Sequence, residues 1–109
     1  MWTQGQIIEV RAAWERPPWC RDDWLLVTPT ASGRRHYARV EDVAMGDGQE
    51  CWIPAMVVTD TEGRHGISVK FLGYAGEASV DTAYARHVRV ATDATLRKEF
   101  VRQVTEHMR

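Results

Sequence analysis

Cysteine is scarce in this chain, and no zinc-binding pattern is present. The two cysteines, Cys20 and Cys51, do not form a CxxC pair. Together with His36 and His65 they are the candidate soft ligands, but their separations fit none of the closed zinc patterns. We therefore expect no metal site. Two unpaired cysteines are typical of a protein kept in a reducing, intracellular compartment.

Long apolar runs are also missing. No stretch approaches the roughly 20 apolar residues that a membrane-spanning helix needs. The first apolar stretch already carries Glu9 and Arg11, which does not fit a secretory signal peptide. These absences predict a soluble intracellular protein without a membrane partner.

The sequence has neither an excess of one charge nor a catalytic pattern. Acidic and basic residues alternate along the chain, and the formal net charge is -1, so no basic footprint for nucleic acid stands out. No Ser/His/Asp order, no paired carboxylates in an apolar pocket and no glycine-rich phosphate loop before a helix can be identified. We expect neither an enzyme nor a bound cofactor.

Short β-prone segments make up most of the chain. The strongest are residues 51–59 and 66–72, which flank a turn-rich segment and predict a β-hairpin. In its second arm Phe71 continues an alternation of apolar and polar residues, so one face of that strand should be buried. The other predicted strands are 6–12, a hairpin of 24–28 with 36–40, and short strands near 78–80 and 87–90.

The last segment changes to helical spacing. Asp93 can cap a helix over 93–108. Its apolar residues recur on one side, which should pack on the strands: Leu96, Phe100, Val101, Val104 and Met108. The sequence therefore predicts a single domain, 1–109, that is mainly β, with a small SH3-like barrel and a C-terminal α-helix.

Three motifs resemble Tudor domains of the survival-of-motor-neuron type. The chain opening carries Trp2, Gly5, Gln6, Val10 and Trp14; a second motif runs Cys51, Trp52, Ile53, Pro54, Ala55 and Val57; a third has Val69, Phe71, Gly73, Tyr74 and Gly76. The resemblance covers barrel residues 2–14 and 51–90. It makes residues 15–50, with their hairpin, an insertion between the first two strands of the barrel.

The resemblance implies a reader of methylated arginine or lysine in a protein peptide, since Tudor domains enclose that cation in an aromatic box. Carried over to this chain, the box uses Trp14, Phe71 and Tyr74, with Trp52 as a neighbour. Ile53 stands where the family usually has a tyrosine. A nuclear protein, part of a larger chromatin or RNA-protein complex, is what the family favours.

Other interpretations stay open at this point. Phe71 is also in register for an ordinary core residue, and Trp14, Trp19 and Trp24 either roof the barrel or form an exposed interaction patch. Arg34, Arg35 and Arg39 form a local basic cluster, to which 86–89 can add. If both clusters met beside exposed tryptophans, the chain would suit RNA or DNA. A scaffold subunit that binds unmodified partners is the third reading.

Overall fold

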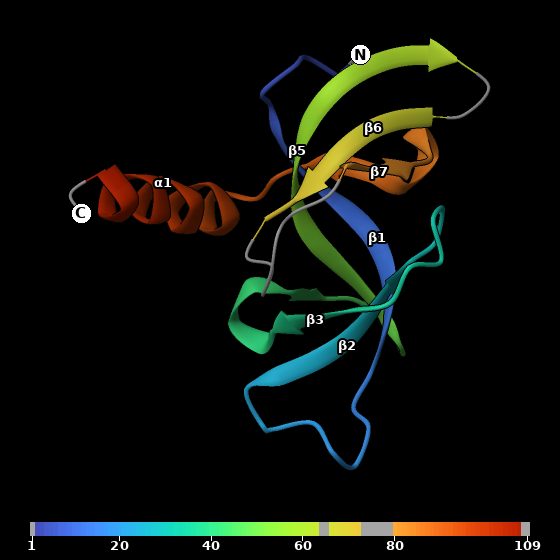
Figure 1. The fold of residues 1–109 in the computed structure, drawn as a ribbon, viewed down its shortest axis with the longest axis vertical. Helices are drawn as coiled ribbons and strands as arrows, with labels where there is room; N and C mark the ends of the chain where they lie inside the picture. The colour runs from blue at the N-terminus through green and yellow to red at the C-terminus, as the bar shows by residue number, and fades with distance from the viewer. Residues whose placement is uncertain (1, 64–65, 73–79, 108–109) are drawn as a thin grey trace.

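The computed structural model describes residues 2–63, 66–72 and 80–107, with the side chains of 60–63 and 107 left out. The described chain is mainly β, with one C-terminal helix (Figure 1). Its elements are β1 Ile7–Glu15, β2 Trp24–Pro29, β3 His36–Arg39, η1 Val40–Asp42, β4 Ala44–Met45, β5 Glu50–Gly63, β6 Gly66–Phe71, β7 Val80–Ala83, η2 Ala85–His87, β8 Val88–Val90 and α1 Asp93–His107.

The strands form one antiparallel sheet in the order β3-β2-β1-β5-β6-β7. β4 pairs with β5, and β8 returns to β1 after the short 3-10 turn η2. One edge of β1 is shared, because Ile8–Val10 pair with β8 whereas Ala12–Glu15 pair with β2. The sheet therefore curls strongly into a half-barrel.

Both predicted hairpins are confirmed. β5 pairs with β6, and β2 pairs with β3 over Trp24–Val27. The first strand runs further than the predicted 6–12, because the inserted β2 offers Leu26–Pro29 as pairing partners for its second half. The strand predicted near 87–90 is β8. Of the strand predicted near 78–80, only Val80 lies in the described residues, where it begins β7.

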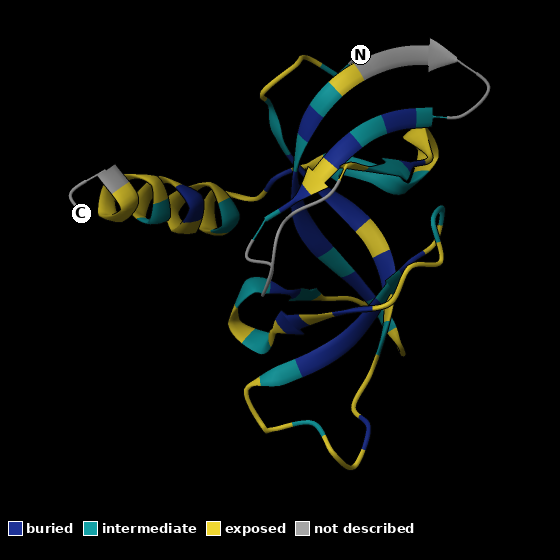
Figure 2. Cartoon of the chain, viewed as in Figure 1, coloured by how far each residue is buried: buried dark blue, intermediate teal, exposed yellow. Residues whose placement is uncertain are grey.

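Alternation along the strands builds one core on the inner face of the curl. The inward residues include Ile8 and Val10 of β1, Ile53 of β5 and Val69 of β6. The β2-β3 hairpin adds Leu25 and Val27 of β2 to the same cluster. The hairpin thus shares the hydrophobic core of the curled sheet, which Figure 2 shows as dark bands along both halves of the sheet.

The helix prediction is confirmed in its span but wrong in its packing. α1 runs from Asp93 to His107, although Thr92 and not Asp93 provides the cap, since its hydroxyl accepts a hydrogen bond from the Thr95 amide at 3.3 Å. The apolar side of the helix points to solvent. The helix projects sideways from the barrel (Figure 1), and most of it is coloured as exposed in Figure 2.

One buried carboxylate explains why the apolar side of α1 faces away from the barrel. Glu9 of β1 is 1% exposed although it points to the outer face of the sheet, where α1 begins. Its carboxylate needs hydrogen-bond donors, which an apolar helix face lacks. The polar side of α1 supplies them, so that side faces the barrel. No described helix is long and apolar enough to cross a membrane.

Candidate functional site

The outer face of the β2-β3 hairpin gathers aromatic side chains. The strand register places Trp24 opposite Arg39 and Leu26 opposite Tyr37, so these four share one face. The loop before β2 adds Trp19, whose indole Nε1 donates a hydrogen bond to the Tyr37 hydroxyl at 3.0 Å. We call Trp19, Trp24, Tyr37 and Arg39 the hairpin aromatic surface.

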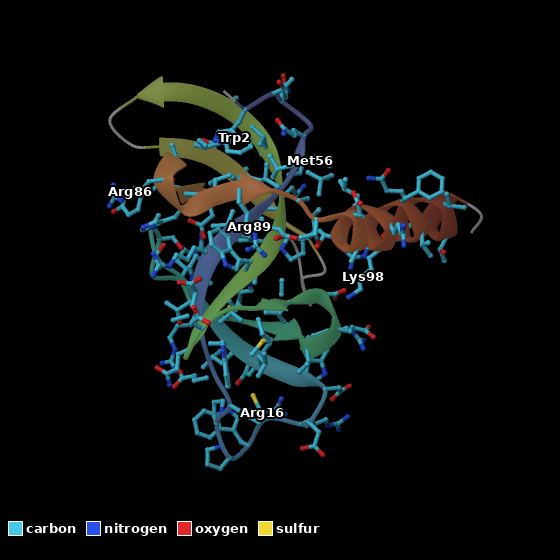
Figure 3. All side chains as sticks on the ribbon, turned by 180° about the vertical axis from the view of Figure 1, so that it is seen from behind. Trp2, Arg16, Met56, Arg86, Arg89 and Lys98 are labelled. Carbon is cyan, nitrogen blue, oxygen red and sulfur yellow. The ribbon has the colours of Figure 1, made fainter. Side chains whose placement is uncertain are left out.

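Local hydrogen bonds hold the loop that presents Trp19. The Cys20 amide donates to the carbonyl of Pro17 at 3.0 Å, which forms a turn after the two prolines. Arg16, labelled in Figure 3, donates from its guanidinium to the carbonyl of Asp22 at 2.8 Å. Trp19 nevertheless remains 70% exposed. A large aromatic side chain is therefore held in a defined place and left open to solvent.

The surface offers two kinds of contact. The guanidinium carbon of Arg39 lies 4.9 Å from the centroid of the Trp24 ring, a cation-π arrangement. The Tyr37 hydroxyl accepts from Trp19 and can still donate its own hydrogen. Exposed tryptophan and tyrosine rings with a polar handle are the side chains most enriched at protein interfaces.

Of the predicted cage residues, Phe71 lies in the core and Trp14 is partly buried against it. Phe71 is 6% exposed, and His36 of the inserted hairpin stacks on it with ring centroids 5.2 Å apart. Trp14 packs against the core, and its indole Nε1 is buried without a hydrogen-bond partner among the described residues. Tyr74, the third wall of the predicted cage, lies outside the described residues. A ligand at Phe71 would have to displace His36.

The other predicted cage residue, Trp52, points to the opposite face of the sheet. It alternates with the buried Cys51 and Ile53, as strand geometry predicts. Arg89 places its guanidinium carbon 4.2 Å from the centroid of the Trp52 ring. The structure thus brings Trp14 and Phe71 to the core face and separates Trp52 from them, with a cation of the chain itself already on its ring.

Arg89 belongs to a network around Glu9 that the sequence analysis missed. Arg89 donates from Nε to the Glu9 carboxylate at 2.7 Å, and Thr95 donates from its hydroxyl at 2.5 Å. The Thr92 amide is a third donor at 3.3 Å. Burial alone would raise the pKa of Glu9, but these hydrogen bonds lower it below its ordinary value. Figure 3 shows Arg89 on the sheet near the start of α1.

One contact joins the β2-β3 loop to η2. The Thr30 hydroxyl of the β2-β3 loop lies 2.7 Å from Nδ1 of His87 in η2, although 57 residues separate them. Arg35 is paired with Glu15 at 2.7 Å, and Arg86 stacks on Tyr84 with 4.6 Å from its guanidinium carbon to the ring centroid. Among the described residues, Arg34 and Arg86 have no carboxylate partner.

The described residues contain no cluster of metal-binding side chains. No three of their His, Cys, Asp and Glu side chains gather as metal ligands. Cys51 is fully buried, and burial raises the pKa of its thiol to about 11, so it is a poor nucleophile at neutral pH.

No family model, no curated protein and no solved structure matches this chain.

Proposed function

We propose that this chain is a non-catalytic recognition module that binds a segment of another protein on the hairpin aromatic surface. The observation that carries the proposal is the exposed Trp19 ring, fixed to Tyr37 by a hydrogen bond and lying near the Arg39-Trp24 pair. Fixed aromatic side chains lose little conformational entropy on binding, which favours affinity.

The resemblance to Tudor domains supports a recognition role in two ways. A curled sheet in which β8 returns to β1 after a 3-10 turn agrees with an SH3-like barrel of that family. The cation already stacked on Trp24 also indicates that this surface suits a positively charged side chain. The proposed ligand is a peptide with arginine or lysine, unmodified or methylated, that replaces Arg39 on the ring.

A peptide array tests the proposal. Short arginine- and lysine-containing peptides are printed in unmodified and methylated pairs and probed with the protein and with Trp19→Ala. We expect binding that Trp19→Ala reduces strongly. The matched control Tyr84→Ala, which removes an exposed aromatic side chain just before η2, should leave binding unchanged. Equal binding by the protein and Trp19→Ala would show that the hairpin aromatic surface is not the site.

A second variant distinguishes binding at the hairpin aromatic surface from binding at Phe71. His36→Ala removes the ring that covers Phe71. If the methylated peptides bind at Phe71, His36→Ala should bind them more tightly than the parent protein, whereas a ligand of the hairpin aromatic surface should be unaffected.

The contact between the β2-β3 loop and η2 favours single-stranded nucleic acid as a second candidate ligand. The loop carries Arg34, η2 carries Arg86, and Tyr84 just before η2 adds an aromatic ring. Binding of a fluorescent oligonucleotide should weaken as salt rises, with a slope of about 0.7 per phosphate contact. The Arg34→Ala, Arg86→Ala double variant should lower that slope. An unchanged slope would argue against this ligand.

A further inference from the structure

The strands of this chain form two runs with the same order of elements. The first run is β1, β2, β3, the 3-10 turn η1 and β4, and the second is β5, β6, β7, the 3-10 turn η2 and β8. In each run the first strand pairs antiparallel with the second, and the second strand pairs antiparallel with the third. The described chain therefore follows the same path twice, once up to Met45 and once from Glu50.

The two 3-10 turns agree in backbone geometry. Arg39 precedes η1 with φ -72° and ψ 137°, and Tyr84 precedes η2 with φ -72° and ψ 135°. In both runs the residue after the turn, Val43 or Val88, donates its backbone amide to the carbonyl of the first residue of the turn. Val88 follows Val43 by 45 positions, and Tyr84 follows Arg39 by the same offset. The two turns therefore correspond residue by residue.

Residues that face the core recur at the same offset. Three pairs of them are also identical in type: Ile8 with Ile53, Ala38 with Ala83, and Val43 with Val88. A fixed period in both topology and sequence is typical of an internal repeat, in which one supersecondary unit occurs twice. Both copies of this unit contribute their residues to one continuous core.

The two copies exchange strands. β4, which ends the first run, pairs with β5 of the second, and β8, which ends the second run, pairs with β1 of the first. β1 and β5 also pair with each other along residues 7–13 and 50–56. Two lobes result, which share these two strands. The first lobe is β3-β2-β1-β5-β4 and the second lobe is β7-β6-β5-β1-β8 (Figure 1).

We propose that the two lobes open and close as one cooperative unit, because neither lobe keeps its five strands without β1 and β5. If residues 15–50 were only an insertion, β2, β3 and β4 could open and leave the five strands of the second lobe in place. Contacts between the lobes oppose such separate opening. His36 of β3 stacks on Phe71 of β6, and the Thr30 hydroxyl lies 2.7 Å from Nδ1 of His87. Opening of the first lobe alone would break both contacts.

The coupling gives the repeat a part in recognition. The hairpin aromatic surface lies on the first lobe, whereas Glu9 and the start of α1 lie beside β8 in the second lobe. A ligand on the first lobe should therefore reduce the opening of the second lobe as well. This consequence rests on the proposed function. The coupling itself does not, because opening is measured without a ligand.

Amide hydrogen exchange of the full chain, followed residue by residue, tests the coupling. Val27 of β2 and Val69 of β6 are both fully buried, and each lies in a strand that only one lobe contains. Val27→Ala leaves a cavity in the first lobe, so it should speed exchange of the slowest amides of β2 and of β6 by the same factor, about tenfold or more. Val69→Ala should do the same from the second lobe. Val101→Ala, at an exposed position of α1, is the control and should leave exchange in both strands unchanged.

The parent protein supplies a second measurement that needs no substitution. The slowest amides of β2 and β6 should show the same dependence of exchange on urea concentration, because the slope reports the surface that opening exposes. Two different slopes, or a Val27→Ala effect confined to β2, β3 and β4, would overturn the proposal and show that these strands open on their own. If the peptide array shows no binding while both variants act on both lobes, the proposed function fails and the coupling stands.

Discussion

The imidazole of His36 stacks on the ring of Phe71, with an interplanar angle of 30°. The contact joins the β2-β3 hairpin to the last residue of β6, and both side chains are buried. It makes the packing of this hairpin sensitive to the protonation of one side chain.

Acid should weaken the fold through His36. Burial lowers the pKa of His36 and outweighs the neighbouring backbone of Arg34 and the charge of Asp81, which raise it. The imidazole is therefore protonated more readily in the unfolded chain. Its stabilising effect is complete above the unfolded pKa of about 6.5 and is lost as pH falls through the lower folded value. Urea unfolding between pH 7 and pH 5 should show this loss.

The variant His36→Gln should remove that part of the pH dependence. His87 also has a lowered pKa, mainly through burial and then through Arg86, so His87→Gln should remove a separate part of the pH dependence. If His36→Gln keeps the full pH dependence of the parent protein, His36 is not its source.

Glu9→Gln should destabilise the chain and loosen the start of α1. An amide accepts the Thr95 and Arg89 hydrogen bonds less well, and leaving buried groups poorly paired costs about 1 to 3 kcal/mol. Chemical denaturation gives the free energy of unfolding, and hydrogen exchange should rise in the first turns of the helix. Glu41→Gln, whose side chain is exposed, should change the free energy by less than about 0.5 kcal/mol. Equal effects would argue against the network.

Gly66→Ala should be much more harmful than Gly33→Ala. Both glycines have a positive φ, 84° and 67°, which costs a residue with a side chain about 1 to 2 kcal/mol. An added Cβ at Gly66 would also lie 2.2 Å from the carbonyl oxygen of Ala83, whereas at Gly33 it would meet nothing within 4 Å. Guanidinium unfolding of the two variants should show this difference. Similar losses would mean that β5-β6 adapts to the extra carbon.

One thiol should react in the native protein and two after unfolding. Cys51 is fully buried with a raised pKa, whereas Cys20 lies partly exposed in the loop that presents Trp19. Counting thiols with a disulfide reagent tests this, and Cys20→Ser should remove the native reaction. Rapid native labelling of Cys20→Ser would show that the core around Cys51 opens readily.

The sequence predicted the strands better than the surfaces. Alternation in Ile67, Val69 and Phe71 was enough to locate β6 and its buried face, because strand periodicity is local. The orientation of α1 on the sheet could not be predicted from local sequence spacing. An apolar stripe normally packs inward, but here the burial of Glu9 decides the orientation, and nothing adjacent to Glu9 in the sequence indicates that Arg89, Thr92 and Thr95 will surround it.

The candidate site shows the same limit. The cluster of tryptophans and prolines was visible, yet whether it roofs the barrel or faces solvent depended on the pairing of β2 with β3. The contact of Thr30 in the β2-β3 loop with His87 in η2 likewise joins two segments that lie far apart in the sequence. Such contacts between distant segments follow from topology and cannot be read from spacing.

The pairing of β8 with β1 sets an order for synthesis. Val90 is made more than 80 residues after its partner Ile8, and two of the residues that donate to Glu9, Thr92 and Thr95, follow Val90. Loop closure over such a distance is slow compared with hairpin formation. The β2-β3 and β5-β6 hairpins can therefore form on the growing chain. The edge of β1 at Ile8–Val10 stays unpaired until β8 is made. During that interval, aggregation or chaperone binding would compete with folding.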